Sequence, residues 1–175
     1  MKMNITLMVA CIFIWASGLS ISQLESTKLR IGIFDSRCIA VAYGRSAGFM
    51  NEMDSIRTAH TKAKEKGNTE LVEELEQLGP TKQVLLHQQV FSNGSIKNIL
   101  EKLREKFPAL AKDNEVKMIL SKWEIPFADE SIELIDVTDQ LTVLFNPDEE
   151  TKKVIENMKL MEPMPIEKIS IDPMK

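Results

Sequence analysis

The residues best placed to do chemistry follow a short apolar run near the start of the chain. Asp35 stands directly after Leu29–Phe34, at the end of a predicted strand, a position where phosphotransfer nucleophiles often lie. The second aspartate expected two positions later is replaced by Arg37. Two interpretations stay open. Either Asp35 caps a following helix by accepting backbone N–H bonds, or Asp35, Ser36, Arg37 and Tyr43 form a small ligand pocket or an enzymatic site.

Side chains that could bind metal are few. His60 and His87 fall on segments predicted to be opposite helical arms, where they could approach each other. Met158, Met161 and Met164 are three residues apart and could offer thioethers to Cu(I), although the first two would share a core-facing helix face. The sequence contains no phosphate-binding glycine loop, no G-x-S-x-G, no H-E-x-x-H and no C-x-x-C. We therefore predict a protein that is not an enzyme and has no metal and no cofactor.

Composition indicates one soluble domain. The chain has 175 residues, 43% of them hydrophobic, with 22 Lys+Arg against 26 Asp+Glu and a formal charge of −4. No run of cations is present, and nucleic-acid surfaces need clustered cations to replace phosphate counterions. Nucleic acid is therefore excluded as a partner.

The pattern after the first predicted strand is helical. Apolar or small residues recur at alternating four- and three-residue spacings, as in a coiled-coil seam, at Ala42, Ser46, Phe49, Met53 and Ile56. The spacing weakens at Gly67-Asn68, stops at Gly79-Pro80 and resumes towards Phe107. It predicts two antiparallel arms over about 36–112 with a tip at Gly79-Pro80, or with unequal arms and a tip at Gly67-Asn68.

The second half of the chain predicts further strands and helices. Apolar runs at 116–121 and 132–135 predict two strands, and 136–145 predicts a short helix. Asn146-Pro147 predicts the start of another helix that ends near Met161, before a proline-rich extended tail over 162–175. The predicted class is α+β, with a small β-sheet body, a projecting antiparallel helical hairpin of short coiled-coil-like arms, and a single domain over 23–161.

The first residues predict export. Met1–Ser22 has one cation followed by an apolar stretch, which is typical of a signal peptide, and the small residues Ser20 and Ser22 predict cleavage after Ser22. Cys11 lies in a loosely lipobox-like context, so a lipid anchor is the alternative. Cys38 is then alone in the mature chain, which excludes an intramolecular disulfide and predicts a buried thiol.

The order of these segments resembles that of the Skp/OmpH family, the periplasmic chaperones of outer-membrane proteins. Three stretches carry the resemblance: the strand Leu29–Phe34 leading directly into a helix, Asn114–Leu120, and Ser131–Leu141 with its aspartate-hydrophobic-threonine segment. The similarity spans roughly Leu29 to Phe145. Unlike that family's strongly basic members, this chain is acidic, and Gly-Asn, Gly-Pro and Ser-Asn-Gly-Ser interrupt its arms.

The resemblance implies an exported, ATP-independent holdase of the periplasm that binds unfolded or outer-membrane client proteins. It also implies a homo-oligomer, typically a trimer joined through the β bodies. Inward-facing arm residues such as Phe49, Met53 and Ile56 would then contact the clients.

Overall fold

A computed structural model describes residues 28–169. The predicted signal peptide, its cleavage site and Cys11 lie outside the described residues, as does the end of the predicted tail. The elements follow in the order β1 Leu29–Phe34, α1 Ser36–Gly44, α2 Ala47–Glu65, α3 Thr69–Phe91, α4 Lys97–Leu100, η1 Glu101–Lys106, α5 Phe107–Asp113, β2 Ile119–Ser121, η2 Lys122–Glu124, β3 Ile132–Asp136, α6 Thr138–Val143, α7 Glu149–Lys159 and η3 Ile166–Lys168.

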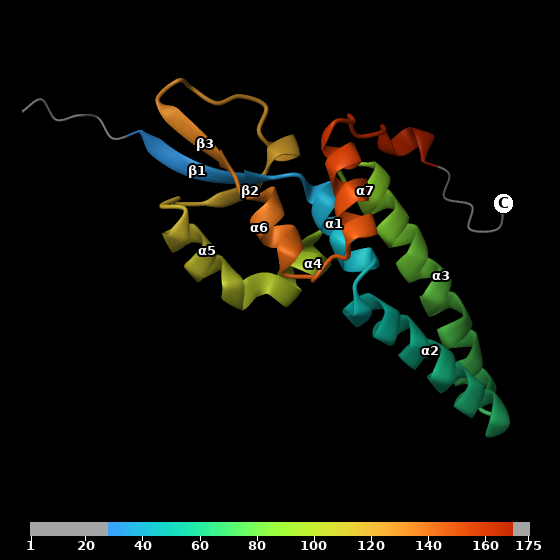
Figure 1. The fold of residues 1–175 in the computed structure, drawn as a ribbon. Helices are drawn as coiled ribbons and strands as arrows, with labels where there is room; N and C mark the ends of the chain where they lie inside the picture. The colour runs from blue at the N-terminus through green and yellow to red at the C-terminus, as the bar shows by residue number, and fades with distance from the viewer. Residues whose placement is uncertain (1–27, 170–175) are drawn as a thin grey trace, which may run out of the picture.

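The three strands form one parallel sheet in the order β2-β1-β3 (Figure 1). Gly32 of the central strand pairs with Ile119 of β2 and with Ile135 of β3. Parallel neighbours need long crossover connections. The segment 35–118 supplies the connection from β1 to β2, and this explains why one helical insertion separates two paired strands.

The protein is α+β, as predicted, but the predicted architecture is wrong. The sheet is parallel, the described chain is mostly helical, and residues 36–112 do not form two antiparallel arms on a small sheet body. Only α2 and α3 extend together away from the sheet, whereas the rest of this segment folds back as α1 and α4–α5 (Figure 1). The four-three spacing misled because any helix with one apolar face on a core has nearly the same repeat as a coiled-coil seam.

The boundaries of individual elements also correct the sequence analysis. The turn between α2 and α3 falls at Gly67-Asn68, the alternative position for the tip, where Gly67 has a φ of +67°, and the first choice, Gly79-Pro80, lies inside α3. α7 is capped by Asp148, whose side chain accepts from the Thr151 N–H, rather than by Asn146. β1 has the predicted bounds, and Asp35 caps α1 as predicted by accepting from the Arg37 N–H.

Two hydrophobic clusters hold the elements together. The larger joins one face of the sheet to α1, the base of α2 and the helices α4–α6, and it contains Phe34, Tyr43, Ile99 and Leu141 among its buried members. The smaller packs α1 on α7 and contains Cys38, which is fully buried as predicted. Burial raises the pKa of the Cys38 thiol to about 12.

Gly44 lets α3 approach α1 closely. A Cβ atom at Gly44 would lie 2.6 Å from Cδ2 of Leu86 in α3. We expect Gly44→Val to lower the free energy of unfolding by about 1–3 kcal/mol through overpacking. Gly48→Val is the matched control, because a Cβ there meets only the Ser46 Oγ at 3.6 Å. Equal urea denaturation midpoints for the two variants would contradict this account.

Candidate functional site

The carboxyl ends of the three strands meet at one edge of the sheet. In open parallel sheets, ligands commonly bind outside this edge, where neighbouring connections diverge. Asp35 follows β1, Lys122 and Trp123 follow β2, and Thr138 follows β3. The Asp35 N–H donates to Thr138 Oγ1 at 3.0 Å, so the segments after β1 and β3 are in direct contact.

The protein's own side chains fill this edge. Asp35 is 1% exposed, and its carboxylate accepts from the Arg37 N–H (3.0 Å), Arg37 Nε (3.1 Å), Arg37 Nη2 (2.8 Å) and Trp123 Nε1 (3.0 Å). Lys122 Nζ lies 3.0 Å from Asp35 Oδ2. Burial raises the pKa of Asp35, but the hydrogen bonds from Arg37, Trp123 and Lys122 outweigh it and leave that pKa below its ordinary value.

Arg37 extends this cluster to the end of α7. Its Nη2 donates to the main-chain carbonyls of Met158 (3.2 Å) and Met161 (2.6 Å), and its guanidinium lies 4.7 Å from the Trp123 ring centroid. Ser36 is 3% exposed, and its hydroxyl has no hydrogen-bond partner among the described residues. Through these contacts Asp35 and Arg37 join the end of β1, the start of α1 and the segment that follows α7.

Tyr43 lies apart from this cluster. Its ring packs edge-on against Phe49 and Phe145 at centroid distances of 5.2 and 5.7 Å, and its hydroxyl donates to Glu52 Oε2 at 2.9 Å. Burial and the bond to Glu52 raise the pKa of Tyr43. The structure therefore brings Asp35, Ser36 and Arg37 together but does not bring Tyr43 to them.

Glu52 joins three helical segments and was missed by sequence reasoning. Its carboxylate lies 2.6 Å from Lys82 Nζ and 3.5 Å from Lys102 Nζ. The hydrogen bond from Lys82, assisted by that from Tyr43, holds the pKa of Glu52 below its ordinary value against its partial burial. No local pattern signals this network, because its partners are remote in sequence.

The predicted client-binding residues occupy two environments. Phe49 and Met53 are 8% and 7% exposed and belong to the larger hydrophobic cluster, so their side chains mainly join the base of α2 to the body. Ile56 is half-buried at the margin of that cluster. Met53 and Ile56 also line an open groove between α2 and α3.

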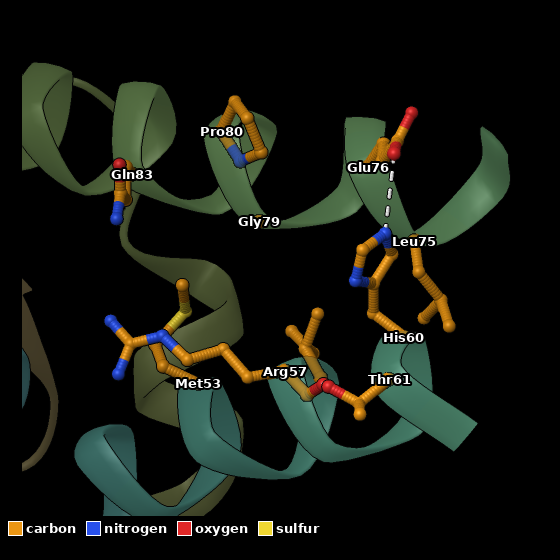
Figure 2. A pocket seen from close by; sticks show the side chains of 10 residues that line it. Met53, Arg57, His60, Thr61, Leu75, Glu76, Gly79, Pro80 and Gln83 are labelled. Carbon is orange, nitrogen blue, oxygen red and sulfur yellow. Dashed lines mark hydrogen bonds and ion pairs between the residues drawn. The ribbon is translucent and has the colours of Figure 1, made fainter. Parts of the chain in front are cut away.

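This hairpin groove has a volume of about 430 Å³ (Figure 2). Its lining from α2 comprises Met53, Ile56, Arg57, His60 and Thr61, and its lining from α3 comprises Leu75, Glu76, Gly79, Pro80 and Gln83. His60 Nε2 lies 3.2 Å from Glu76 Oε1 and bridges the two helices at one end of the groove (Figure 2). The result is an apolar floor with charged and amide groups at the rim.

Gly79-Pro80 shapes the α3 wall of the groove instead of ending a helix. Pro80 has no N–H, so the Glu76 carbonyl lacks its intrahelical donor four residues on. Gly79 contributes no side chain, and a Cβ there would meet only the methyl of Met53 at 3.8 Å. The α3 wall therefore has space at Gly79 that a larger residue would fill.

We expect Pro80→Ala to raise the free energy of unfolding by about 2 kcal/mol, because proline in a helix interior is about 3 kcal/mol less favourable than alanine and unfolded-state entropy offsets part of this. Urea denaturation measures the change. Gln77→Ala, on the exposed side of the same helix turn, is the control and should change stability by less than about 0.5 kcal/mol. A Pro80→Ala protein that is less stable than wild type would contradict the conclusion that Pro80 weakens a continuous helix α3.

The described residues show no metal centre. Within 28–169, no group of three or more His, Cys, Asp or Glu side chains is arranged to hold a metal ion. His60 pairs with Glu76, while His87 packs on Phe91 at 4.6 Å between ring centroids. The helices in this part of the chain also include none that combines the length and apolar character needed to cross a bilayer.

Comparison of the chain with protein-family models, with curated proteins and with solved structures finds no match.

Proposed function

We propose that this protein is an exported, ATP-independent holdase of the cell envelope that binds unfolded or outer-membrane client proteins. The observation that carries the proposal is the open hairpin groove between α2 and α3. Unfolded chains present apolar side chains next to main-chain amides and carbonyls in no fixed order. A groove with an apolar floor and a mixed polar rim suits such ligands, because it does not require one arrangement of polar groups.

Exposed leucines form a second apolar surface on α3, outside the lining of the groove. Leu71, Leu78 and Leu85 are seven residues apart and 36%, 36% and 40% exposed. This spacing places them in one row along the helix. Apolar rows left in solvent commonly mark interaction surfaces. Several weak contacts along the groove and the row would hold a client by equilibrium binding alone, without fixing its structure.

The sheet supports the second part of the proposal, which is that the protein acts as a homo-oligomer. One face of the sheet belongs to the larger cluster, whereas the apolar side chains of the other face lie outside both clusters: Leu29, Ile31, Ile33, Leu120, Ile132 and Leu134. Leu29 and Leu134 remain 48% and 40% exposed, whereas Ile31, on the central strand, is already buried at 8% exposure. Parallel sheets are normally covered on both faces. A second copy of the chain is the proposed cover for this open sheet face.

Suppression of client aggregation tests the proposed function. A denatured outer-membrane barrel protein is diluted into buffer without nucleotide, and light scattering is followed with and without the purified protein. Suppression at a near-stoichiometric ratio is expected. Scattering that is unchanged at a severalfold excess of the protein would overturn the proposal.

A matched pair of variants locates the activity. Leu75 lines the hairpin groove, whereas Val72, also half-buried on α3, does not. Leu75→Lys is expected to raise the concentration needed for suppression about tenfold, which corresponds to losing one buried apolar side chain. Val72→Lys should leave that concentration within about twofold of wild type. Equal effects of the two variants would place client binding elsewhere.

A further inference from the structure

A second apolar groove lies beside the edge strand β2. It has a volume of about 520 Å³, and none of its lining residues belongs to α2 or α3. Its helical wall is Leu100, Phe107, Pro108 and Ala111, and its strand wall is Met118 and Ile119. An adjoining cavity of about 220 Å³ shares Leu100, Arg104 and Phe107 with it and continues the groove along α4.

The groove opens at the edge of the sheet rather than on one face. Met118 and Ile119 are consecutive residues, and consecutive side chains of an extended segment point to opposite faces. A cavity that contacts both side chains must therefore run along the outer edge of β2. Met118 is also 49% exposed, so this edge is open to solvent.

The register of the sheet leaves hydrogen-bonding groups on this edge. Gly32 of β1 faces Ile119, and the Gly32 N–H donates to the Met118 carbonyl at 2.8 Å. In a parallel ladder, the N–H and C=O of the residue directly opposite point away from the partner strand. The N–H and C=O of Ile119 therefore point outward, and among residues 28–169 no backbone group is bonded to them.

The positive charge beside this second groove disfavours the binding of basic polypeptide segments. Arg104 lines both cavities, and Lys97 and Glu101 line the smaller one. Glu101 is paired with Arg104 at 3.2 Å, which leaves Lys97 uncompensated among the groove's lining residues. The groove therefore favours apolar side chains and disfavours a Lys or Arg side chain that points into it.

We propose that β2 accepts an added strand: an extended apolar segment of an unfolded polypeptide pairs with Ile119 and places alternate side chains in this second groove. The inference rests on the proposed function and deepens it, because it names the conformation in which part of a client is held. Main-chain hydrogen bonds supply affinity that is independent of client sequence, and the groove adds a preference for apolar residues at every second position.

N-methylated peptides test strand addition directly. The probe is a fluorescent eight-residue peptide in which Val and Ile alternate with Ser and Thr, and its binding to the full chain is measured by anisotropy. Methylating the N–H groups of one alternate set removes the donors to β2, whereas methylating the other set affects donors that point to solvent. Methylation of the set that donates to β2 should weaken binding about tenfold or more, and methylation of the other set should weaken it less than about twofold.

A shift of the peptide by one residue cannot restore binding, because it turns the apolar side chains out of the groove. Equal effects of both sets would overturn the inference.

Two methionine variants provide the protein-side control. Met118→Lys places a charge on the open edge, and charged edges block strand pairing. Met50→Lys makes the same change at a methionine of α2 that is also 49% exposed. Met118→Lys should lose peptide binding about tenfold, and Met50→Lys should retain it. Peptide binding by Met118→Lys at wild-type affinity would overturn the inference.

The aggregation assay separates this inference from the proposed function. If wild type suppresses aggregation but the two methylated sets bind alike, the added strand is refuted and the holdase proposal stands. If the peptide sets differ as expected but wild type does not suppress aggregation, the holdase proposal fails and β2 remains a strand-accepting site.

Discussion

Replacing Asp35 by alanine is expected to lower the free energy of unfolding by about 3–5 kcal/mol, because it leaves the Arg37 guanidinium buried without its carboxylate partner. Arg37 is 1% exposed, and its remaining acceptors are two main-chain carbonyls at the end of α7. The same change removes the carboxylate that accepts from the indole N–H of Trp123 and pairs with the ammonium of Lys122. The variant should therefore loosen the contact between the sheet edge and α7 as well as the start of α1.

Urea denaturation measures this effect against a surface control. Asp54 also pairs with an arginine, Arg57 at 3.0 Å, but its side chain is 62% exposed. Exposed pairs contribute little, so Asp54→Ala should change stability by less than about 1 kcal/mol. Similar losses for the two variants would show that Asp35 does not join the segments as its contacts indicate.

The acid dependence of stability gives a second signature of Asp35. Its pKa in the folded protein lies below its ordinary value. The carboxylate therefore contributes stability above the unfolded-state pKa of about 3.9, and this contribution is lost as the pH falls through the folded-state pKa. The stability difference between wild type and Asp35→Ala should narrow between about pH 5 and pH 2. A difference that widens with acid would contradict the lowered pKa.

If the protein is the proposed homo-oligomer, Leu134→Lys is expected to convert it into monomers of 19.9 kDa or less. Leu134 projects from the open sheet face at 40% exposure, and a charge there would have to be buried by a second copy. Light scattering coupled to size exclusion gives the mass directly. A fully monomeric wild-type protein at tens of micromolar would contradict the proposed role of this face.

Val143→Lys is the control for this experiment. Val143 is 56% exposed but lies on α6, away from the open sheet face. Its substitution should leave the oligomer mass unchanged, and near-ultraviolet circular dichroism of both variants verifies that each remains folded. If Leu134→Lys and Val143→Lys both dissociated the proposed oligomer, the interface between copies would not be confined to the open sheet face.

Local signals in the sequence were sufficient to predict several features of the fold. The apolar run Leu29–Phe34 is bounded by charge, and the structure has a strand with the same bounds. Asp35 precedes a helix and caps it, and the lone Cys38 is buried. Each of these features depends on a few neighbouring residues or on a single side chain's preference for the interior, so periodicity and residue type are informative.

The packing of elements that are distant in the chain could not be predicted from local sequence signals. The four-three spacing identified helices but not the neighbours they pack on, and the two-arm architecture was therefore wrong. Pro80 was interpreted as a helix end, although packing against α2 keeps α3 continuous through it. Trp123 lies 88 residues from Asp35, so no local pattern could reveal that its indole fills the sheet edge.

The measurement that tests the central claim most directly is photo-cross-linking of an unfolded outer-membrane client from the hairpin groove. A benzophenone side chain replaces Gln83, an exposed residue that lines the groove, or Glu73, an exposed α3 residue outside it. In the absence of nucleotide, position 83 should cross-link the client in near-stoichiometric yield and position 73 should give only background. Equal yields at both positions, or no cross-link at position 83, would contradict the account that unfolded clients are held between α2 and α3.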